Sequence, residues 1–301
     1  MPRPALAGCI AMAIVRDTRG VAMNDAQRVS HFPRSPYCGL SWIKEGAVFE
    51  IRTAEIDSGR VHLERQPDIS VSGHRQNPTT MWSPADAYGV TVVFYPDAWQ
   101  ALTGSSIEFV SERTVAVEDA VSGELAAIVR RAAQQSDVDE GFLLLQDGLE
   151  PLWRQARPRQ GMAPVWFKDW AVALAVRAST LGAGRSLRQL QRRVKRWTGF
   201  NQRDLDQQAR MEQLFVRSYE EGIGDLAGLA QEFGYADQAH MGRQVRKITG
   251  CSPARIMELI ETEESYWIYR LIGARLSAED AAASLTAASN RAGRPADHAA
   301  K

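Results

Sequence analysis

The sequence feature that most constrains the fold is an internal repeat in the C-terminal half. The segment SLRQLQRRVKRWTGFNQRDL, from Ser186, aligns without a gap with DQAHMGRQVRKITGCSPARI, from Asp237, at an offset of 51 residues. Arg192 matches Arg243 in this alignment. An ungapped internal match predicts a duplicated supersecondary unit.

Each copy of the repeat has the pattern of one amphipathic helix. Ser186 and Asp237 are side chains that cap helix N-termini well. Each helix is expected to end at Gly199 or Gly250, where glycine readily adopts the left-handed conformation. Apolar residues recur at i, i+4 and i+7, which places them on one face: Leu190, Val194 and Trp197 in the first copy, and Met241, Val245 and Ile248 in the second.

The charge of these two helices differs from that of the whole chain. The chain has 36 Lys and Arg residues and 36 Asp and Glu residues, so its net charge of +0 does not indicate a nucleic-acid partner. The bodies of the two predicted helices contain no acidic residue. Their basic side chains are Arg188, Arg192, Arg193, Lys195 and Arg196 in the first copy, and His240, Arg243, Arg246 and Lys247 in the second.

The segment before the second copy completes a helix-turn-helix pattern. GDLAGLAQEFGYAD predicts a short helix that breaks at Gly234, and the next helix starts at Asp237. The second helix of such a motif enters the major groove, where Arg recognises guanine and Gln or Asn recognises adenine. The candidate base-reading side chains are therefore Gln189, Gln191 and Gln238, beside Arg188, Arg192 and Arg243.

The stretch GYADQAHMGRQVRKITGCSP, residues 234–253, resembles the signature of AraC/XylS-type transcription regulators. The first copy resembles the first helix-turn-helix of that family. The resemblance covers residues 165–272 and implies a bi-lobed all-α DNA-binding domain. A long helix, here from Arg203 to Glu220, would join the lobes, and the two recognition helices would enter successive major grooves.

Carried over by position, the resemblance implies particular base-facing residues. They are Arg188, Gln189 and Arg192 in the first copy, and Ala239, His240 and Arg243 in the second. Gln191, Lys195, Gln238 and Lys247 complete the predicted DNA-binding set, and Lys247 is expected to meet phosphate. The chain departs from the family pattern at Met241 and Val245, where aromatic residues are usual, although both remain apolar.

The N-terminal half predicts a β-rich domain followed by helices. Runs such as SWIKEGAVFEIRTAEI and YGVTVVFY are rich in β-branched and aromatic residues and are separated by turn residues. Asp97 is expected to cap a short helix that ends at Gly104, and amphipathic helices are predicted at 123–135 and 142–157. Trp42, Trp82, Tyr88 and Tyr95 are candidates either for a pocket or for the core. This half resembles, more loosely, the effector or oligomerisation domains of the same family, which are often cupin-like β barrels.

The predicted fold class is α+β, with a β-rich domain preceding an all-α helix-turn-helix domain. We expect a poorly structured N-terminus at 1–30, a sensing or oligomerisation domain at 31–157, a linker at 158–164, the DNA-binding domain at 165–272 and a disordered tail at 273–301. The Pro-rich and charged linker also predicts that residues 161–274 fold and bind DNA as a separate unit.

The predicted function is sequence-specific DNA binding in transcription regulation, not catalysis. The sequence has no nucleophile elbow or phosphate loop, and His31, His62 and His74 lack metal-ligand spacing, so we expect no cofactor and no metal. The alternative is a β-domain enzyme or small-molecule-binding protein whose helical domain serves DNA repair or subunit contact.

The expected partners are double-stranded DNA, a small apolar or mixed-polarity effector, a second copy of the chain and RNA polymerase. No segment reaches the roughly 18 apolar residues of a membrane span. Cys9, Cys38 and Cys251 are too scattered for a disulfide framework, and Cys38 is expected to be a buried apolar residue. These features predict a cytoplasmic protein.

Overall fold

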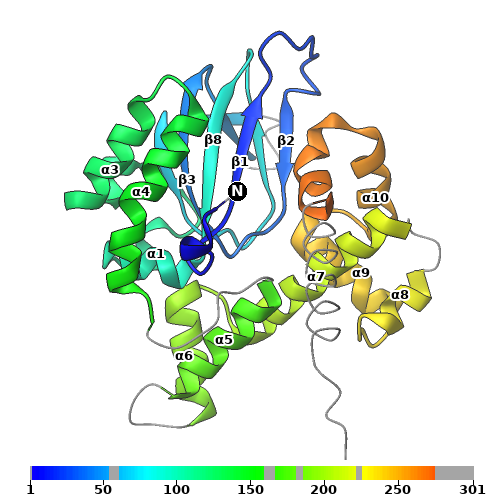
Figure 1. Ribbon diagram of the computed structural model, residues 1–301. Helices are drawn as coiled ribbons and strands as arrows, with labels where there is room; N and C mark the ends of the chain where they lie inside the picture. Colours follow the sequence, from blue (N-terminus) through cyan, green and yellow to red (C-terminus); the bar gives the residue numbers. More distant parts are fainter. Residues whose placement is uncertain (1, 54–60, 159–166, 181–185, 222–225, 275–301) are drawn as a thin grey trace, which may run out of the picture.

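The computed structural model describes residues 2–53, 61–158, 167–180, 186–221 and 226–274. A β-rich N-terminal domain, covered by helices on one side, lies beside an all-helical C-terminal domain (Figure 1). The predicted fold class, a β-rich domain followed by an all-α domain, is confirmed. No helix in these described ranges is long and apolar enough to cross a membrane.

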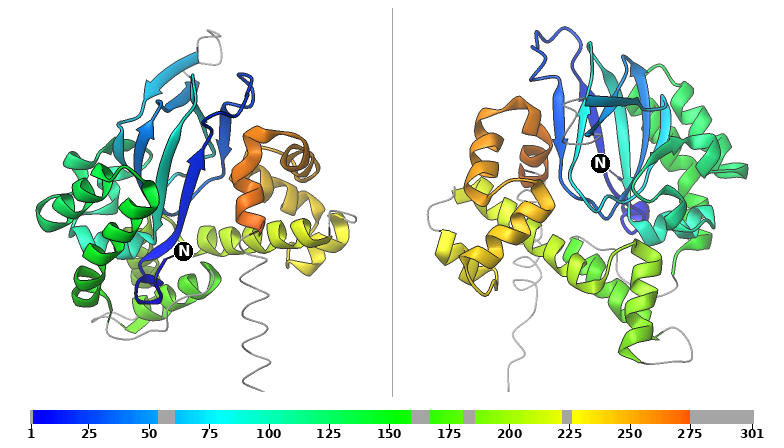
Figure 2. Two further views of the ribbon diagram at one scale, coloured as in Figure 1. Left: turned by 45° about the horizontal axis from the view of Figure 1, so that its top comes forward. Right: turned by 180° about the vertical axis from the view of Figure 1, so that it is seen from behind.

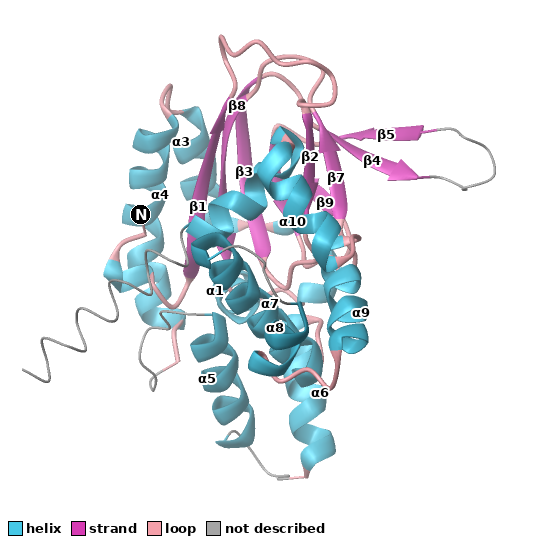
Figure 3. Ribbon diagram, turned by 90° about the vertical axis from the view of Figure 1, so that its right-hand side faces the viewer, coloured by secondary structure: helices cyan, strands magenta, loops and turns pink. Residues whose placement is uncertain are grey.

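Two antiparallel sheets form the N-terminal domain. The five-stranded sheet has the order β1 (Ile10–Asp17), β8 (Tyr88–Phe94), β3 (Cys38–Glu45), β6 (Ile69–Ser72) and β9 (Thr114–Ala116). The four-stranded sheet has the order β2 (Val29–Phe32), β7 (Thr79–Trp82), β4 (Phe49–Thr53) and β5 (Val61–Arg65). Strands β4 and β5 extend away from the rest of the domain (Figure 3).

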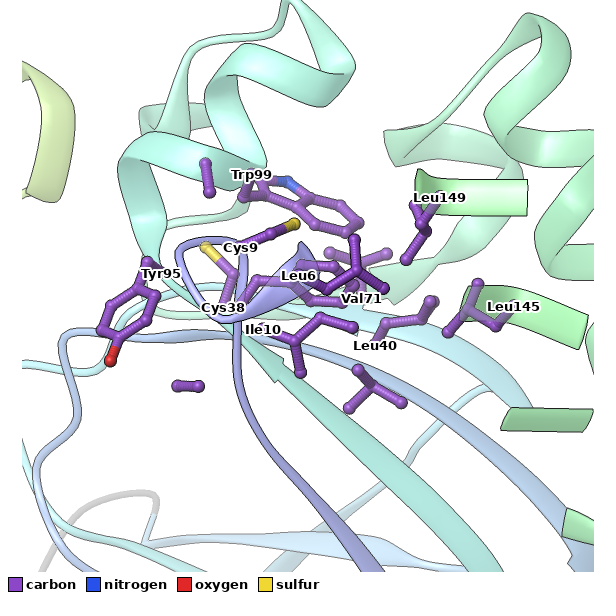
Figure 4. Packing of buried hydrophobic residues seen from close by; sticks show 14 of the residues in the cluster. Leu6, Cys9, Ile10, Cys38, Leu40, Val71, Tyr95, Trp99, Leu145 and Leu149 are labelled. Carbon is purple, nitrogen blue, oxygen red and sulfur yellow. The ribbon is translucent and has the colours of Figure 1, made fainter. Parts of the chain in front are cut away.

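Helices cover the outer face of the five-stranded sheet. They are α1 (Pro96–Thr103), α3 (Gly123–Gln134) and α4 (Val138–Ala156), with the short elements η2 (Ile107–Val110) and α2 (Val117–Ala120) between them. Leu40 and Val71 on the sheet lie close to Leu145 and Leu149 on α4, and all four are fully buried (Figure 4). The apolar stripes of the two predicted helices are thus covered largely by the protein's own sheet.

The N-terminal residues are more ordered than the sequence predicted. Residues 10–17 form β1, which pairs with β8, and a short 3-10 helix, η1 (Pro4–Leu6), precedes it. The expectation of a poorly structured N-terminus at 1–30 is therefore wrong. Leu6, Cys9 and Ile10 are buried in the core beneath the helices, and pairing with β8 satisfies the backbone groups along one side of this edge strand.

The predicted capping role of Asp97 is also wrong. Helix α1 starts after Tyr95 with no side-chain cap, although it does end at Gly104 in the left-handed conformation, as predicted. The Asp97 carboxylate instead accepts a hydrogen bond from Trp170 Nε1 at 2.8 Å and pairs with Arg177 at 2.8 Å. Its partners are therefore in the C-terminal domain.

The C-terminal domain has two helical lobes. The first contains α5 (Phe167–Thr180) and α6 (Leu187–Thr198), and the second contains α8 (Leu226–Glu232), α9 (Gln238–Thr249), α10 (Pro253–Thr262) and η3 (Glu264–Tyr266), followed by helical residues 267–274. Helix α7 (Gln202–Glu221) joins the lobes (Figure 2), so the predicted bi-lobed arrangement and connecting helix are confirmed.

The two lobes differ in how they bury their apolar residues. The first lobe continues the core of the N-terminal domain: Trp170 stacks on Tyr95 at a centroid distance of 5.2 Å, and Phe167 packs against Tyr37 at 5.6 Å. The second lobe has its own apolar cluster. The predicted linker lies outside the described residues except for Pro158, and residues 275–301 of the predicted tail also lie outside them.

Candidate functional site

Helices α6 and α9 are structural copies of each other. Each has 12 residues, and their bounds differ by the offset of the sequence repeat. Ser186 Oγ accepts from the Gln189 backbone N–H, and Asp237 Oδ1 accepts from that of His240, so both predicted caps are confirmed. Gly199 and Gly250 end the helices with φ values of 75° and 81°, in the left-handed region where glycine carries no Cβ penalty.

A matched pair of threonines closes the last turn of each helix. Thr198 Oγ1 donates to the Val194 carbonyl at 2.9 Å and accepts from the Phe200 backbone N–H at 3.0 Å. Thr249 makes the equivalent bonds in α9, to Val245 O at 2.9 Å and from Cys251 N at 3.1 Å. The repeat alignment contained these threonines, but their role depends on both being buried in the last turn of their helices.

The two faces of each helix divide as the apolar pattern predicted. Val194, Met241, Val245 and Ile248 are fully buried. The opposite face carries the predicted DNA-binding residues that are exposed: Arg188, Gln189, Gln191, Arg192, Lys195, Gln238, Ala239, Arg243 and Lys247. The structure therefore presents two exposed basic surfaces from equivalent helices.

His240 differs from the other predicted DNA-binding residues because it is half-buried. Its Nδ1 accepts from the Ala236 backbone N–H at 3.3 Å, and its ring lies edge-on to Tyr235 at a centroid distance of 5.7 Å. These contacts hold the turn that precedes α9. His240 thus has a structural role in the free protein, in addition to its predicted position near a base.

Lys247 is exposed but already has an anionic partner. Its Nζ donates to Asp204 Oδ1 at 2.9 Å. Burial alone would raise the pKa of Asp204, but the hydrogen bond from Lys247 and the charge of Arg34 outweigh burial and lower it. Asp204 is therefore a carboxylate at neutral pH, and a phosphate contact by Lys247 would compete with it.

A second site lies between the two sheets as a cavity of about 360 Å³. Small side chains on the inner face of the five-stranded sheet leave this space: Gly39, Ser41, Ser70, Ser72 and Thr91. Phe32 and Met81 line it from the other sheet, and Phe215 of α7 and Trp267 also border it. Both domains thus contribute to the wall.

The cavity wall contains polar groups that lack partners. Among the described residues, Gln66 Oε1, Arg34 Nε and Arg28 Nη1 are buried without a hydrogen-bond partner, and all three residues line the cavity. Gln66 is 7% exposed and Arg34 is fully buried. Buried polar groups are normally satisfied, so a buried acceptor and a buried donor here are consistent with a site for a ligand of mixed polarity.

The sequence had indicated this pocket only partly. Of the four candidate aromatic residues, Tyr88 and Tyr95 border the cavity. Trp42 is buried in the core on the helix-covered side, and Trp82 packs against Phe49 at 5.9 Å. Cys38 is fully buried, as predicted, and burial raises the pKa of its thiol. In the described ranges, no group of three or more His, Cys, Asp or Glu is placed to hold a metal ion.

The fold and the paired basic helices define the class: a DNA-binding protein with a helix-turn-helix domain and a separate cavity-containing domain. Residues 182–258 match the family model described as a helix-turn-helix domain, and this range includes α6 and α9. The C-terminal domain is thus a helix-turn-helix domain of the AraC/XylS type, as its sequence signature predicted. No curated protein sequence matches the chain.

Several solved structures resemble the chain distantly. An apo variant of ToxT from Vibrio cholerae has a TM-score of 0.38 at 8% identity, over 82% of this chain and 96% of ToxT. Wild-type ToxT with bound unsaturated fatty acid has a TM-score of 0.33 at 9% identity, over 81% and 94% of the two chains. The AraC-like transcriptional activator CuxR has a TM-score of 0.24 at 12% identity, over 90% and 93%. At these TM-scores, the likeness to the solved structures adds no weight to the assignment of the C-terminal domain.

Proposed function

We propose that this protein is a sequence-specific transcription regulator of the AraC type that binds DNA with α6 and α9 together. The observation that carries the proposal is the structural equivalence of two helices whose exposed surfaces are basic and contain no acidic residue. Side chains near the N-terminal end of a recognition helix contact base edges. In this chain those positions include Arg188 and Gln238, and Arg192 and Arg243 lie about one turn further along; all four are exposed.

A selection from a random pool of DNA duplexes tests this function directly. The full-length chain should enrich a site with two sequence blocks about one helical turn apart, because the two helices would occupy successive grooves. Binding should be saturable and weaken steeply with salt. Enrichment of no sequence, with equal binding to all duplexes, would refute sequence-specific recognition, and no binding to any duplex would favour a helical domain used for subunit contact.

We also propose that the cavity binds the effector. A volume of about 360 Å³ is within the range of small-molecule sites, and the wall combines apolar side chains with hydroxyl groups and, among the described residues, several whose side chains have an unsatisfied polar atom. These features favour a ligand with an apolar body that carries both hydrogen-bond donors and acceptors.

The dye 8-anilinonaphthalene-1-sulfonate is a suitable probe because it combines an apolar body with polar groups. Ser41 lies on the central strand β3, lines the cavity and bonds to Thr91 at 2.8 Å. Ser41→Trp should fill the cavity and abolish saturable dye fluorescence, whereas the control Ser41→Ala should retain it. Equal fluorescence of both variants would place the dye elsewhere and remove support for a cavity ligand.

Self-association and contact with RNA polymerase form the remaining part of the proposal. Leu143 on α4 lies outside the buried stripe of this helix and is 52% exposed, which leaves an apolar position for a second copy. Sedimentation of the full chain, compared with Leu143→Glu, tests the dimer. A wild-type chain that sediments as a monomer at all concentrations would exclude it.

A further inference from the structure

Arg34 occupies an unusual position between the two domains. It belongs to the segment between β2 and β3 of the N-terminal domain, and its side chain is fully buried. Together with Pro33 and Ser35 it borders the cavity. Burying a guanidinium costs free energy unless charged and hydrogen-bonding partners compensate, so its contacts are informative.

The side chain of Arg34 contacts the segment that follows the first recognition helix. Its Nη1 donates to Asp204 Oδ1 and its Nη2 to the Asp204 carbonyl, both at 3.1 Å. The guanidinium carbon lies 4.8 Å from the centroid of the Phe200 ring. Phe200 directly follows Gly199, the C-cap of α6, and Asp204 lies in the first turn of α7.

The same residue contacts the end of the second recognition helix. The Arg34 backbone N–H donates to the Ile248 carbonyl at 2.8 Å, in the last turn of α9. That carbonyl is one of those that a helix end leaves without an internal partner. Lys247 of α9 shares Asp204 Oδ1 with Arg34. One residue of the N-terminal domain therefore contacts the C-terminal ends of both recognition helices.

Further contacts support this arrangement. Gln76 Nε2 donates to the Gly199 carbonyl at 3.0 Å, and the His74 ring lies edge-on to Phe200 at 5.4 Å. All these contacts are at the C-terminal ends of α6 and α9. The predicted base-reading residues lie in the N-terminal half of each helix. Arg188 in the first turn of α6 and Arg243 near the middle of α9 remain exposed, so the contact with the N-terminal domain is compatible with DNA binding.

We propose that Arg34 is a positioning residue for DNA recognition: it holds α6 and α9 at the separation at which both enter successive major grooves. This inference rests on the proposed function. Two groove-binding units strengthen each other only when their geometry allows both to bind at once. Without Arg34, the lobes would be joined less rigidly and would accept a wider range of block separations.

The test uses full-length protein and the two-block duplex that the wild-type chain selects from the random pool. A series of duplexes carries one to five extra base pairs between the blocks. Wild-type protein should lose affinity sharply with the first insertions. Arg34→Met, which retains much of the aliphatic stem, should bind the uninterrupted duplex about tenfold more weakly and show a flatter dependence on the insertions. The sequence of each block should stay the same.

Arg52→Met is the matched control. Arg52 lies on β4, is half-buried and pairs with the Glu50 carboxylate at 3.4 Å. Arg52 and Glu50 both belong to the N-terminal domain, and Arg52 is not one of the residues that line the cavity. Arg52→Met should keep the wild-type dependence on block separation, and a flattened dependence in this control would overturn the role assigned to Arg34.

Thermal unfolding of each variant shows whether Arg34→Met is folded. If it is not, Asp204→Asn replaces it. This change removes the negative charge that both Arg34 and Lys247 contact and preserves the shape of the side chain. A folded variant with the wild-type dependence on block separation would overturn the positioning role alone. A wild-type chain that selects no two-block site would refute the proposed function itself, before any substitution is made.

Discussion

A Cβ atom added at Gly199 would overlap the imidazole ring of His74. The end of the first recognition helix thus lies directly against a buried side chain of the N-terminal domain. Gly250, the repeat partner of Gly199, has the same left-handed backbone, but its added Cβ would lie 3.8 Å from Pro78 Cγ, an ordinary contact distance. The two helix ends share a backbone conformation but differ in their surroundings.

This difference predicts unequal costs for two matched substitutions. Gly250→Ala should lower the free energy of unfolding by about 1–2 kcal/mol, the cost of a left-handed non-glycine residue. Gly199→Ala should cost about 1–3 kcal/mol more, because His74 must move within a packed site. Urea unfolding followed by circular dichroism measures both. If both variants lost the same free energy of unfolding, His74 would be able to move away from the new methyl group without cost.

Arg243 and Arg192 should each read one base pair. Arg243→Ala should weaken specific binding by about 1–3 kcal/mol and relax the base preference at one position. Arg192→Ala should do the same about one helical turn away. Selection from a random pool with each variant measures this, with Arg154→Ala, an exposed substitution on α4, as the control. Lost affinity with an unchanged selected sequence would identify both arginines as backbone contacts, and DNA shape or the glutamines would then carry specificity.

Lys247 should contribute to affinity without reading sequence. If it contacts phosphate, Lys247→Ala should weaken binding to all duplexes evenly and reduce the slope of log K against log salt by about 1. Asp204 competes for the ammonium group in the free protein. DNA affinity measured across a salt series decides whether Lys247 contacts phosphate or Asp204 in the complex. An unchanged slope would mean that Lys247 stays with Asp204.

His74 should make stability depend on pH. Burial, with repulsion from Arg75, lowers the pKa of His74 to about 4, whereas histidine in an unfolded chain has a pKa of about 6.5. The unfolded chain binds more protons between these values, so the contribution of His74 is fully present above about pH 6.5 and is lost as the pH falls toward about 4.

The measurement is urea unfolding at several pH values. His74→Gln should remove part of the loss of stability between about pH 6.5 and pH 4. His62→Gln, at an exposed position on β5, serves as the control and should keep the wild-type pH dependence. If His74→Gln also kept it, other buried groups would be responsible.

The helical domain should be less independent than its linker suggested. In a fragment of residues 161–274, the first lobe would lose the surface that covers Phe167, Trp170 and Phe200. We therefore expect hydrogen exchange to show an unprotected first lobe in this fragment, while the second lobe keeps protection through its own core. Equal protection of both lobes would restore the prediction of an autonomous domain.

The sequence by itself determined the recognition helices in detail. Their bounds, caps, glycine stops and buried faces follow from interactions within a few residues along the chain, and a 51-residue repeat presented each signal twice. The β-rich class of the N-terminal domain was predictable for a similar reason, since strand composition and turn residues are local signals. The base-reading roles of the exposed side chains remain predictions.

Only the tertiary structure decided what the polar faces and the N-terminal residues do. Ser41 and Thr91 alternate with buried residues in their strands, and this pattern is the same whether the polar face meets water or a cavity. Likewise, β1 became recognisable only through its pairing with β8, more than seventy residues away. Arg34 and Asp204 are separated by 170 positions, and their ion pair depends on how the domains pack, which no local pattern encodes.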